Sequence, residues 1–318
     1  MKVLITGGAG FIGSHLADRL LARGDEVLVI DNYATARRDN LVPRENLTVI
    51  EGTIVDKDVV DETWEAFRPD AVAHAAASYK DPENWPEDAA TNAAGTANVV
   101  MASEAADVGR LVYFQTALSY GLHPLEQPIT LDHPLRPEES SYAISKTAGE
   151  YYVRLSNLYW VSLRLANAYG PRNVTGPLPT FVHRLTSGKP CFVMDTRRDF
   201  IYVDDLIDLV VKAVDGQGAK GVYHASSGSD YSIKELFDAT VQALGIALDE
   251  EVEVRERGPD DAFTILLDPS RTRAEFGGWT PKTPLDEGVA AAIEYYNQHG
   301  IEETYTHLKM AEEKQPAQ

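Results

Sequence analysis

Tyr142 and Lys146 are the two residues whose types and spacing point most directly to chemistry. They stand four positions apart in a segment expected to be helical, so both side chains project from one face. A phenol has an ordinary pKa of about 10 and is a poor base near neutral pH. A nearby ammonium group stabilises the phenolate and lowers that pKa, which suits the pair to acid–base catalysis. The same spacing also arises by chance on solvated helix faces, so other features must decide between the two interpretations.

A glycine-rich turn follows the first expected strand. Residues 7–13 read G-G-A-G-F-I-G, with Gly7, Gly10 and Gly13 three positions apart. Glycines at this spacing allow a tight turn, a close backbone approach to a pyrophosphate and close packing of the next helix. The N-terminus of that helix then offers N–H donors to the phosphates. Because the turn lies between a strand and a helix, it predicts dinucleotide binding rather than a simple helix cap.

An acidic residue, Asp31, stands at the expected end of the second strand. A carboxylate there accepts hydrogen bonds from the adenosine ribose and repels a 2′-phosphate, which favours NAD over NADP. Arg37 and Arg38 follow in the same loop and keep NADP as an alternative.

The elements that must position these residues alternate along the first half of the chain. The expected strands are residues 2–6, 27–30, 47–50, 71–74, 111–114 and 161–165, and the expected helices are residues 11–23, 57–67, 86–108 and 142–157. The first five strands are apolar almost throughout, as strands buried on both faces are. This alternation predicts the α/β class, with a doubly wound parallel sheet of the Rossmann type covered by helices on both faces.

The pattern loosens after about residue 168. Further helices are expected at residues 179–187, 204–214, 232–244, 269–276 and 284–298, and further strands at 221–225, 251–255 and 264–267. We expect residues 1–170 to form the dinucleotide-binding domain, with residues 202–227 returning to it. Residues 171–201 and 228–308 would then form a smaller, mixed α/β substrate-binding domain, and residues 309–318 a flexible tail.

Composition and charge narrow the class of protein. The 318 residues carry 29 Lys and Arg against 49 Asp and Glu, a formal net charge of −20, which argues against binding to nucleic acid or an anionic membrane. Cys191 is the only cysteine, and no C-x-x-C or H-E-x-x-H pattern indicates a metal site. The chain starts with an expected strand instead of a charged leader, and no apolar run is long enough to span a bilayer. We therefore expect a cytoplasmic protein.

Taken together, these motifs resemble the extended short-chain dehydrogenase/reductase family, specifically its sugar-nucleotide epimerases and dehydratases. The resemblance runs over essentially the whole length and is strongest for the 4-epimerases of nucleotide-activated hexoses in bacterial surface-polysaccharide pathways. The matching segments are residues 6–15 (TGGAGFIGSH), 31–32 (DN), 74–77 (HAAA), 92–96 (NAAGT), 141–146 (SYAISK), 164–172 (RLANAYGPR) and 198–205 (RDFIYVDD).

The resemblance implies three catalytic residues. Tyr142 would take the proton of a sugar hydroxyl, while Lys146 would hold the nicotinamide ribose and lower the pKa of that tyrosine. The hydroxyl of Thr116 would orient the same sugar oxygen; its assignment depends on matching Tyr120-Gly121 to the family's Tyr-Gly, and Ser119 is the alternative.

The resemblance also implies two binding sets. Substrate contacts would come from Thr116, Tyr142, Asn167 on the diphosphate, Arg198 as its charged clamp, and Arg257 as a second clamp. Cofactor contacts would come from Gly7, Gly10, Phe11, Ile12, Gly13, Asp31, Asn32, Thr53, Ile54, Ala75, Ala76, Ala77, Lys80, Asn92, Tyr142 and Lys146.

Two segments depart from the family pattern. Where the family has Gly-Asp-Ile after the third strand, this chain has Gly52-Thr53-Ile54, so the carboxylate that usually meets the adenine amino group is missing. The loop before Arg198 lacks the common Gly-Asp-Gly and is a few residues shorter.

The residues after Thr116 separate the possible reactions. Related dehydratases carry an Asp-Glu pair there and related decarboxylases usually a Glu, whereas this chain has Ala117 and Leu118, neither of which can transfer a proton. The sequence therefore predicts NAD-dependent epimerisation of a UDP- or dTDP-hexose at C4 through a transient 4-keto sugar. A keto-sugar reductase, a dehydratase and a non-catalytic dinucleotide sensor remain as alternatives. In resembling enzymes the helices matching residues 86–108 and 142–157 pair across a two-fold axis, which implies a homodimer.

Overall fold

A seven-stranded parallel sheet forms the centre of the computed structural model, which describes residues 1–258, 261–301 and 304. Its order is β11-β6-β5-β4-β1-β2-β3. The strands are β1 (Lys2–Thr6), β2 (Glu26–Asp31), β3 (Leu47–Glu51), β4 (Ala71–His74), β5 (Arg110–Thr116), β6 (Trp160–Leu165) and β11 (Gly221–Ala225). The predicted doubly wound α/β fold is confirmed. The predicted tail, residues 309–318, lies outside the described residues.

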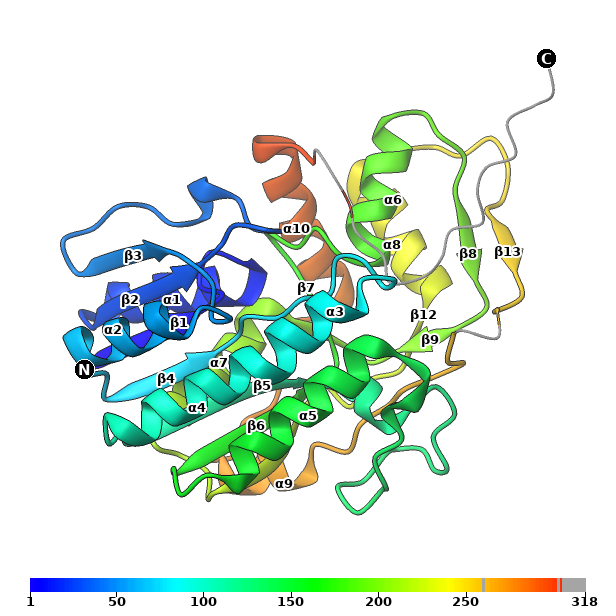
Figure 1. Cartoon of the computed structure of the whole chain (residues 1–318). Coiled ribbons are helices and arrows are strands. Elements are labelled where there is room, and N and C mark those ends of the chain that lie inside the picture. The colour runs from blue at the N-terminus through cyan, green and yellow to red at the C-terminus, as the bar shows by residue number, and fades with distance from the viewer. Residues whose placement is uncertain (259–260, 302–303, 305–318) are drawn as a thin grey trace.

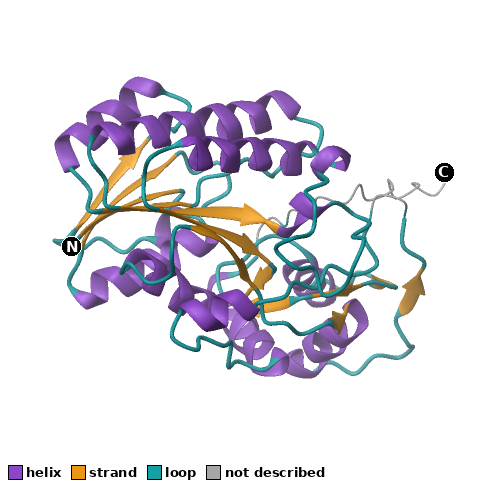
Figure 2. Ribbon diagram, turned by 90° about the horizontal axis from the view of Figure 1, so that it is seen from below, coloured by secondary structure: helices purple, strands orange, loops and turns teal. Residues whose placement is uncertain are grey.

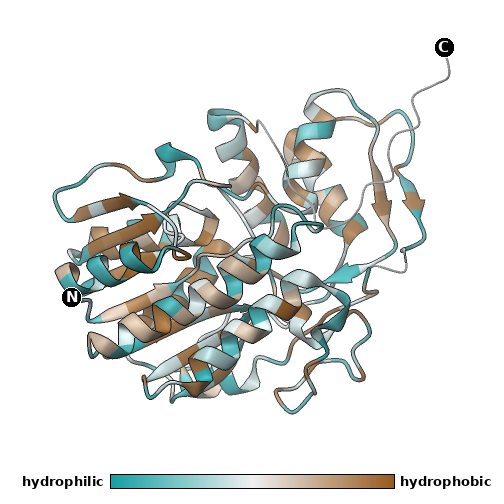
Figure 3. Ribbon diagram, viewed as in Figure 1, coloured by the Kyte–Doolittle hydropathy of each residue, from teal (hydrophilic) through white to brown (hydrophobic). Residues whose placement is uncertain are grey.

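Helices cover both faces of this sheet, as Figure 2 shows. One face is covered by α1 (Phe11–Arg23) and α7 (Val203–Val214), and the other by α2 (Lys57–Phe67), α4 (Thr96–Ala105) and α5 (Ser141–Leu155). Most strands of the sheet are hydrophobic, whereas the outer helices carry mixed surfaces (Figure 3). Apolar burial on both sides of the sheet is thus the main source of its stability. No helix in the described part of the chain combines the length and hydropathy needed to cross a membrane.

The second half of the chain builds a smaller unit beside the carboxyl ends of the strands (Figure 1). It contains the helices α6 (Pro177–Thr186), α8 (Ile233–Leu244) and α10 (Leu285–His299), while α9 (Ser270–Glu275) packs on β11 of the main sheet. Three two-stranded sheets join β7 (Asn167–Tyr169) with β10 (Phe200–Tyr202), β9 (Arg197–Arg198) with β12 (Tyr231–Ser232), and β8 (Phe192–Met194) with β13 (Glu253–Arg255). This unit has an apolar core of its own, separate from the two cores that flank the main sheet.

Three predictions about the elements need correction. β3 is not buried on both faces, because it is the edge strand; Val49, for example, is 39% exposed. The helical stretch predicted at 86–108 runs as α3 (Trp85–Asp88), a π-helix (Ala89–Gly95) and α4, so its middle turn is wider than an α-helical one.

The third correction concerns residues 264–267, which form no strand. They make a single β-bridge, between Ile129 and Leu267. Pro128 precedes Ile129 and has no N–H to extend the ladder. The side chain of Gln127 replaces the missing backbone bonds, donating to the carbonyl of Thr264 and accepting from the N–H of Leu266, both at 2.9 Å.

Candidate active site

A cavity of about 1580 Å³ lies at the carboxyl ends of the sheet strands, between the main sheet and the smaller unit. The chain reverses its direction of sheet growth between β1 and β4, and such a switch point is where open α/β sheets bind ligands. The cavity wall includes all the predicted site residues except Asn92 and Arg257. The parallel sheet brings them together because the carboxyl ends of its strands meet at one edge.

The glycine turn forms one wall of the cavity. Gly7 has a φ of +68°, and a Cβ added there would lie 2.7 Å from the backbone of Ala76. A Cβ on Gly13 would lie 2.3 Å from the carbonyl oxygen of Gly7. No side chain caps the N-terminus of α1, so the N–H groups of its first turn are available to an anion.

Asp31 is fixed beside this turn by backbone donors. Its Oδ2 accepts from the N–H of Ala9 at 2.9 Å, and its Oδ1 from the N–H of Tyr33 at 2.8 Å. Burial raises the pKa of this carboxyl above its ordinary value, and the backbone hydrogen bonds oppose that shift. Asp31 therefore presents a positioned acceptor to the cavity.

Arg37 and Arg38, which kept NADP as an alternative, do not line the cavity. Arg38 makes a bidentate ion pair with Glu51 and lies over the Tyr33 ring, while Arg37 pairs with Asp39. The structure thus commits both cations elsewhere, which favours NAD over NADP.

Thr116 ends β5 and turns its side chain to the cavity. Its hydroxyl oxygen accepts the N–H of Leu118 at 3.1 Å, so its proton is left to donate to a ligand. The alternative, Ser119, is fully buried and donates its hydroxyl to the carbonyl of Thr116 at 2.8 Å. Ser119 does not line the cavity, so the geometry favours Thr116.

Tyr142 and Lys146 both lie in the first half of α5 and line the cavity. Burial raises the pKa of Tyr142 above its ordinary value, and Lys146 is not among the groups that shift it. Burial also lowers the pKa of Lys146 to about 7, against a smaller opposing effect of Glu150. The predicted lowering of the Tyr142 pKa by Lys146 is therefore wrong for this structure, because loss of hydration dominates at both groups.

Tyr113 of β5 holds Lys146 in place. Its Nζ lies 4.2 Å from the centre of the Tyr113 ring, a cation–π contact, and only 1% of the residue is exposed. The hydroxyl of Tyr113 donates to the carbonyl of Lys146 at 2.8 Å. Both the side chain and the backbone of Lys146 are thus fixed against Tyr113.

Two predicted site residues lie away from the cavity. The Asn92 amide is buried and bonds the backbone of Ser78 in both directions and the hydroxyl of Ser145, so it orders the loop after β4 instead of meeting a ligand. Arg257 is exposed and donates to the carbonyl of Asp261 at 3.1 Å. The chain beyond β13 carries it to the surface.

The expected diphosphate residues do line the cavity. Asn167 starts β7, and the Arg198 guanidinium donates to the carbonyls of Arg197 and Ala262 at 2.7 and 2.9 Å. Arg198 also forms a close ion pair with Asp261, and burial lowers its pKa. Asp261 was not predicted from the sequence, although it stands only four residues after Arg257.

Two further cavity residues were missed. Tyr79 packs edge-to-face on Tyr142, with ring centroids 6.5 Å apart, and Gln115 directly precedes Thr116. In the sequence, each is indicated only by its neighbour: Tyr79 precedes Lys80 and Gln115 precedes Thr116.

Comparison with known proteins gives consistent matches over the whole chain. The NAD dependent epimerase/dehydratase family matches residues 3–226. The chain is 34% identical to a UDP-glucose 4-epimerase of Mycolicibacterium smegmatis, over 93% of this chain and 98% of that protein. A dTDP-glucose 4,6-dehydratase of Streptomyces niveus is 29% identical, over 94% of both chains.

Two solved structures show higher sequence identity to this chain than the relatives above. The Bordetella bronchiseptica enzyme WbmH in complex with NAD+ is 54% identical, with a TM-score of 0.91 over 94% of this chain and 99% of that one. The WbmG enzyme of the same organism in complex with NAD and UDP is 44% identical, with a TM-score of 0.89 over 97% and 99%.

Proposed function

Because the chain belongs to the NAD dependent epimerase/dehydratase family, we propose that it inverts a nucleotide-activated hexose at C4 through a transient 4-keto sugar, retaining NAD through turnover. One observation carries this proposal above the others. Thr116, Tyr142 and Lys146 line the same cavity as the glycine turn and Asp31, and no proton-transferring side chain follows Thr116 at positions 117 and 118.

The cavity residues fit NAD. The glycine turn is packed so closely that a Cβ at Gly7 or Gly13 would collide with neighbouring backbone, which keeps the turn tight, and the first turn of α1 offers N–H donors to a pyrophosphate. Asp31 offers its remaining lone pairs to a ribose. When bound, NAD+ supplies the hydride acceptor and a positive charge that favours the Tyr142 phenolate.

The protein's own residues handle the proton. Tyr142 accepts the proton of the sugar C4 hydroxyl, and Thr116 donates a hydrogen bond to the same oxygen. When protonated, Lys146 places a positive charge nearby, and because its side chain is buried this charge acts strongly. On return, Tyr142 gives the proton back to the same oxygen.

The fate of the 4-keto sugar depends on what stands beside it. Elimination of water needs an acid and a base acting on neighbouring carbons, and Ala117 and Leu118 supply neither. Rotation of the keto sugar and reduction from its other face need no further group. This supports an epimerase over the dehydratases that share the family.

The nucleotide end of the substrate would be held by Asn167 and Arg198. The Nη groups of Arg198 already bond two carbonyls and Asp261, so its guanidinium would act on the diphosphate through its charge and its remaining N–H groups. The WbmG neighbour, solved with NAD and UDP, supports a uridine diphosphate here, and the dTDP-glucose 4,6-dehydratase relative supports a thymidine diphosphate as the alternative. We assign substrate binding mainly to residues 171–201 and 228–308, a division supported by the separate apolar core in this part of the chain. The single cysteine supports a cytoplasmic setting.

The experiment that tests the reaction uses the protein as purified. It is incubated with a panel of UDP- and dTDP-hexoses in deuterated buffer without added cofactor, and products are identified by NMR. We expect the C4 epimer, with no deuterium at any carbon. A dehydrated keto sugar, or deuterium at carbon, would contradict the proposal in favour of elimination or enolisation.

A substitution in the glycine turn tests the cofactor site. Gly13→Ala places a Cβ 2.3 Å from the Gly7 carbonyl, so the turn must open. We expect NAD affinity to fall by about ten- to a hundredfold, because losing one hydrogen bond to the charged pyrophosphate costs about 1.5–3 kcal/mol. Calorimetric titration of protein stripped of nucleotide measures this. Gly109→Ala, which adds a Cβ 3.3 Å from the Asp70 carbonyl, far from the cavity, is the control and should bind NAD normally.

A homodimer is the second part of the proposal. α4 and α5 lie side by side (Figure 1) and expose Met101, Ile144, Tyr151 and Leu155, of which Leu155 is 81% exposed. Apolar side chains gathered on adjacent helices mark a protein–protein contact. A second copy related by a two-fold axis would cover them with the same four residues.

Light scattering after gel filtration tests the dimer. We expect twice the chain mass of 34.9 kDa for the wild type, and a single chain mass for a Met101→Lys/Leu155→Lys variant, because four added charges would face one another per dimer. Val254→Lys, at a residue 57% exposed on β13, should remain dimeric. A monomeric wild type would refute the dimer without touching the reaction.

A further inference from the structure

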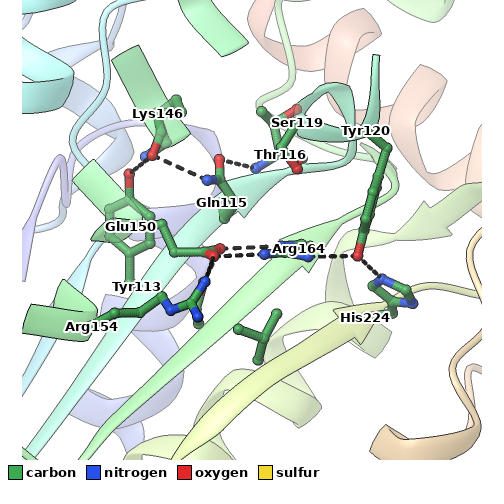
Figure 4. A network of polar contacts seen from close by, with 12 residues as sticks. Tyr113, Gln115, Thr116, Ser119, Tyr120, Lys146, Glu150, Arg154, Arg164 and His224 are labelled. Atoms are coloured by element: carbon green, nitrogen blue, oxygen red, sulfur yellow. Dashed lines mark hydrogen bonds and ion pairs between the residues drawn. The ribbon is translucent and has the colours of Figure 1, made fainter. Parts of the chain in front are cut away.

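Gln115 connects the backbones of two expected catalytic residues. Its Nε2 donates to the carbonyl of Lys146 at 3.1 Å, and its Oε1 accepts from the N–H of Thr116 at 2.8 Å. Figure 4 shows this amide lying between the two residues. The orientation of the amide is fixed by its partners, because a carbonyl only accepts and an N–H only donates. Gln115 is 2% exposed, so water does not compete for either bond.

The strand geometry explains why Thr116 needs this bond. β4 ends at His74, opposite Tyr113, whereas β5 continues to Thr116 along β6. The last residues of β5 therefore have a strand neighbour on one side only. The Gln115 side chain supplies the acceptor for the Thr116 N–H at this end of the strand.

A second donor from the same strand reaches the same carbonyl. Tyr113 and Gln115 are two positions apart in β5, so both side chains lie on one face of the sheet. The Tyr113 hydroxyl donates to the Lys146 carbonyl, and Gly149 makes room for it: a Cβ there would lie 2.6 Å from that hydroxyl. Two side chains of β5 thus hold α5 at the Lys146 carbonyl, and Gln115 also bonds the N–H of Thr116.

We propose that Gln115 is a positioning residue, which holds the Thr116 hydroxyl and the Lys146 ammonium at the separation that the sugar requires. The inference rests on the proposed epimerase function, in which both groups act on one substrate. A misplacement of about 1 Å at a catalytic group costs on the order of a hundredfold in rate. When Gln115 is lost, Tyr113 still holds the Lys146 carbonyl, but the end of β5 at Thr116 is no longer tied to Lys146.

Two variants test this positioning role. Gln115→Met keeps the length of the side chain but makes neither hydrogen bond. Gln115→Glu keeps the shape, but when ionised it directs an acceptor at the Lys146 carbonyl, so it can bridge only when protonated. At pH 8 we expect both variants to lose about ten- to a hundredfold in kcat, with KM for the nucleotide sugar changed less than about threefold. The Glu variant should recover activity as the pH is lowered, and the Met variant should not.

Gln127→Glu is the matched control. Gln127 uses its amide in the same way, on the Thr264 carbonyl and the Leu266 N–H, but it is exposed and lies outside the cavity. We expect wild-type kcat and a wild-type pH profile. Wild-type kcat in Gln115→Met, or a pH profile of Gln115→Glu that coincides with the wild type, would overturn the proposal.

A second measurement needs no turnover, so it separates this proposal from the function. The urea midpoint of Gln115→Glu should fall, relative to the wild type, as the pH rises above 5, because a bridging carboxyl buried in its protonated form has a raised pKa in the folded protein. If the wild type epimerises no sugar but this fall is seen, the bridge stands and the function fails. A midpoint difference that does not change with pH overturns the bridge.

Discussion

Replacing Tyr142 by Phe should reduce kcat by about a thousandfold or more while leaving NAD and nucleotide-sugar binding intact. The change removes one hydroxyl, and general acid–base catalysis by a positioned group accounts for about 10²- to 10⁴-fold in rate. The edge-to-face contact with Tyr79 and the half-buried position of the ring are kept, so the fold should not change.

The Tyr142 experiment needs a binding measurement beside the rate. Turnover is followed by NMR, and NAD and UDP affinities by calorimetry, in the variant and in Tyr152→Phe. Tyr152 is on the same helix and 44% exposed, so its variant controls for the loss of a phenol as such. Activity within tenfold of the wild type for Tyr142→Phe would show that another group takes the proton, and the assigned mechanism would be wrong.

Replacing Lys146 by Met should make the protein less active and more stable. Burial lowers the pKa of Lys146 from 10.5 to about 7, so below pH 7 the folded chain holds a cation that has lost its water. The corresponding penalty is about 5 kcal/mol, and the contact with the Tyr113 ring returns about 1–2 kcal/mol of it. At pH 6 we therefore expect Lys146→Met to gain about 3–4 kcal/mol in free energy of unfolding.

The sign of the pH dependence follows from proton binding. Between pH 7 and about 10 the unfolded chain keeps the lysine proton while the folded chain releases it. Through this group, the stability of the wild type rises with pH over that range, and Lys146→Met should lack the rise. Urea unfolding at pH 6 and pH 9 measures both effects. A variant less stable than the wild type at pH 6 would show that the ammonium is stabilised by its surroundings.

The same Lys146→Met protein should lose about a hundredfold or more in kcat. The charge that destabilises the fold is the one that stabilises developing negative charge on the substrate oxygen and on Tyr142. Activity and stability thus oppose each other at this residue, as they do where a site keeps a strained or desolvated group for function.

The part of the site that is built on the ends of parallel strands could be predicted from the sequence. Gly7, Asp31 and Thr116 each end or follow a strand, so the sheet brings them to one edge whatever the details of packing. Tyr142 and Lys146 join them because one helix carries both at a fixed spacing. These parts of the prediction follow from local pattern and from topology.

The remaining features depend on contacts between distant segments. The pKa of Tyr142 is set by burial, which no local pattern reports, so its direction was predicted wrongly. Asn92 is turned into the interior within the π-helix. The stretch at 264–267 forms no strand, because its bridge partner Ile129, more than a hundred residues earlier, follows Pro128, which has no N–H to extend the ladder. Gln115 has no motif at all, and its role appears only in its two hydrogen bonds.

The cavity lies between two separately packed parts of the molecule, and this has a consequence for unfolding. The smaller unit has an apolar core of its own, and Tyr202 of β10 packs against both that core and one of the cores beside the main sheet. We expect the smaller unit to open at a lower temperature than the main sheet when no ligand is bound. A nucleotide diphosphate, which would contact both parts, should then merge the two calorimetric transitions into one, because it would bind only while both parts are folded. The nucleotide sugar would then stabilise the folded arrangement of the two parts of the enzyme that converts it.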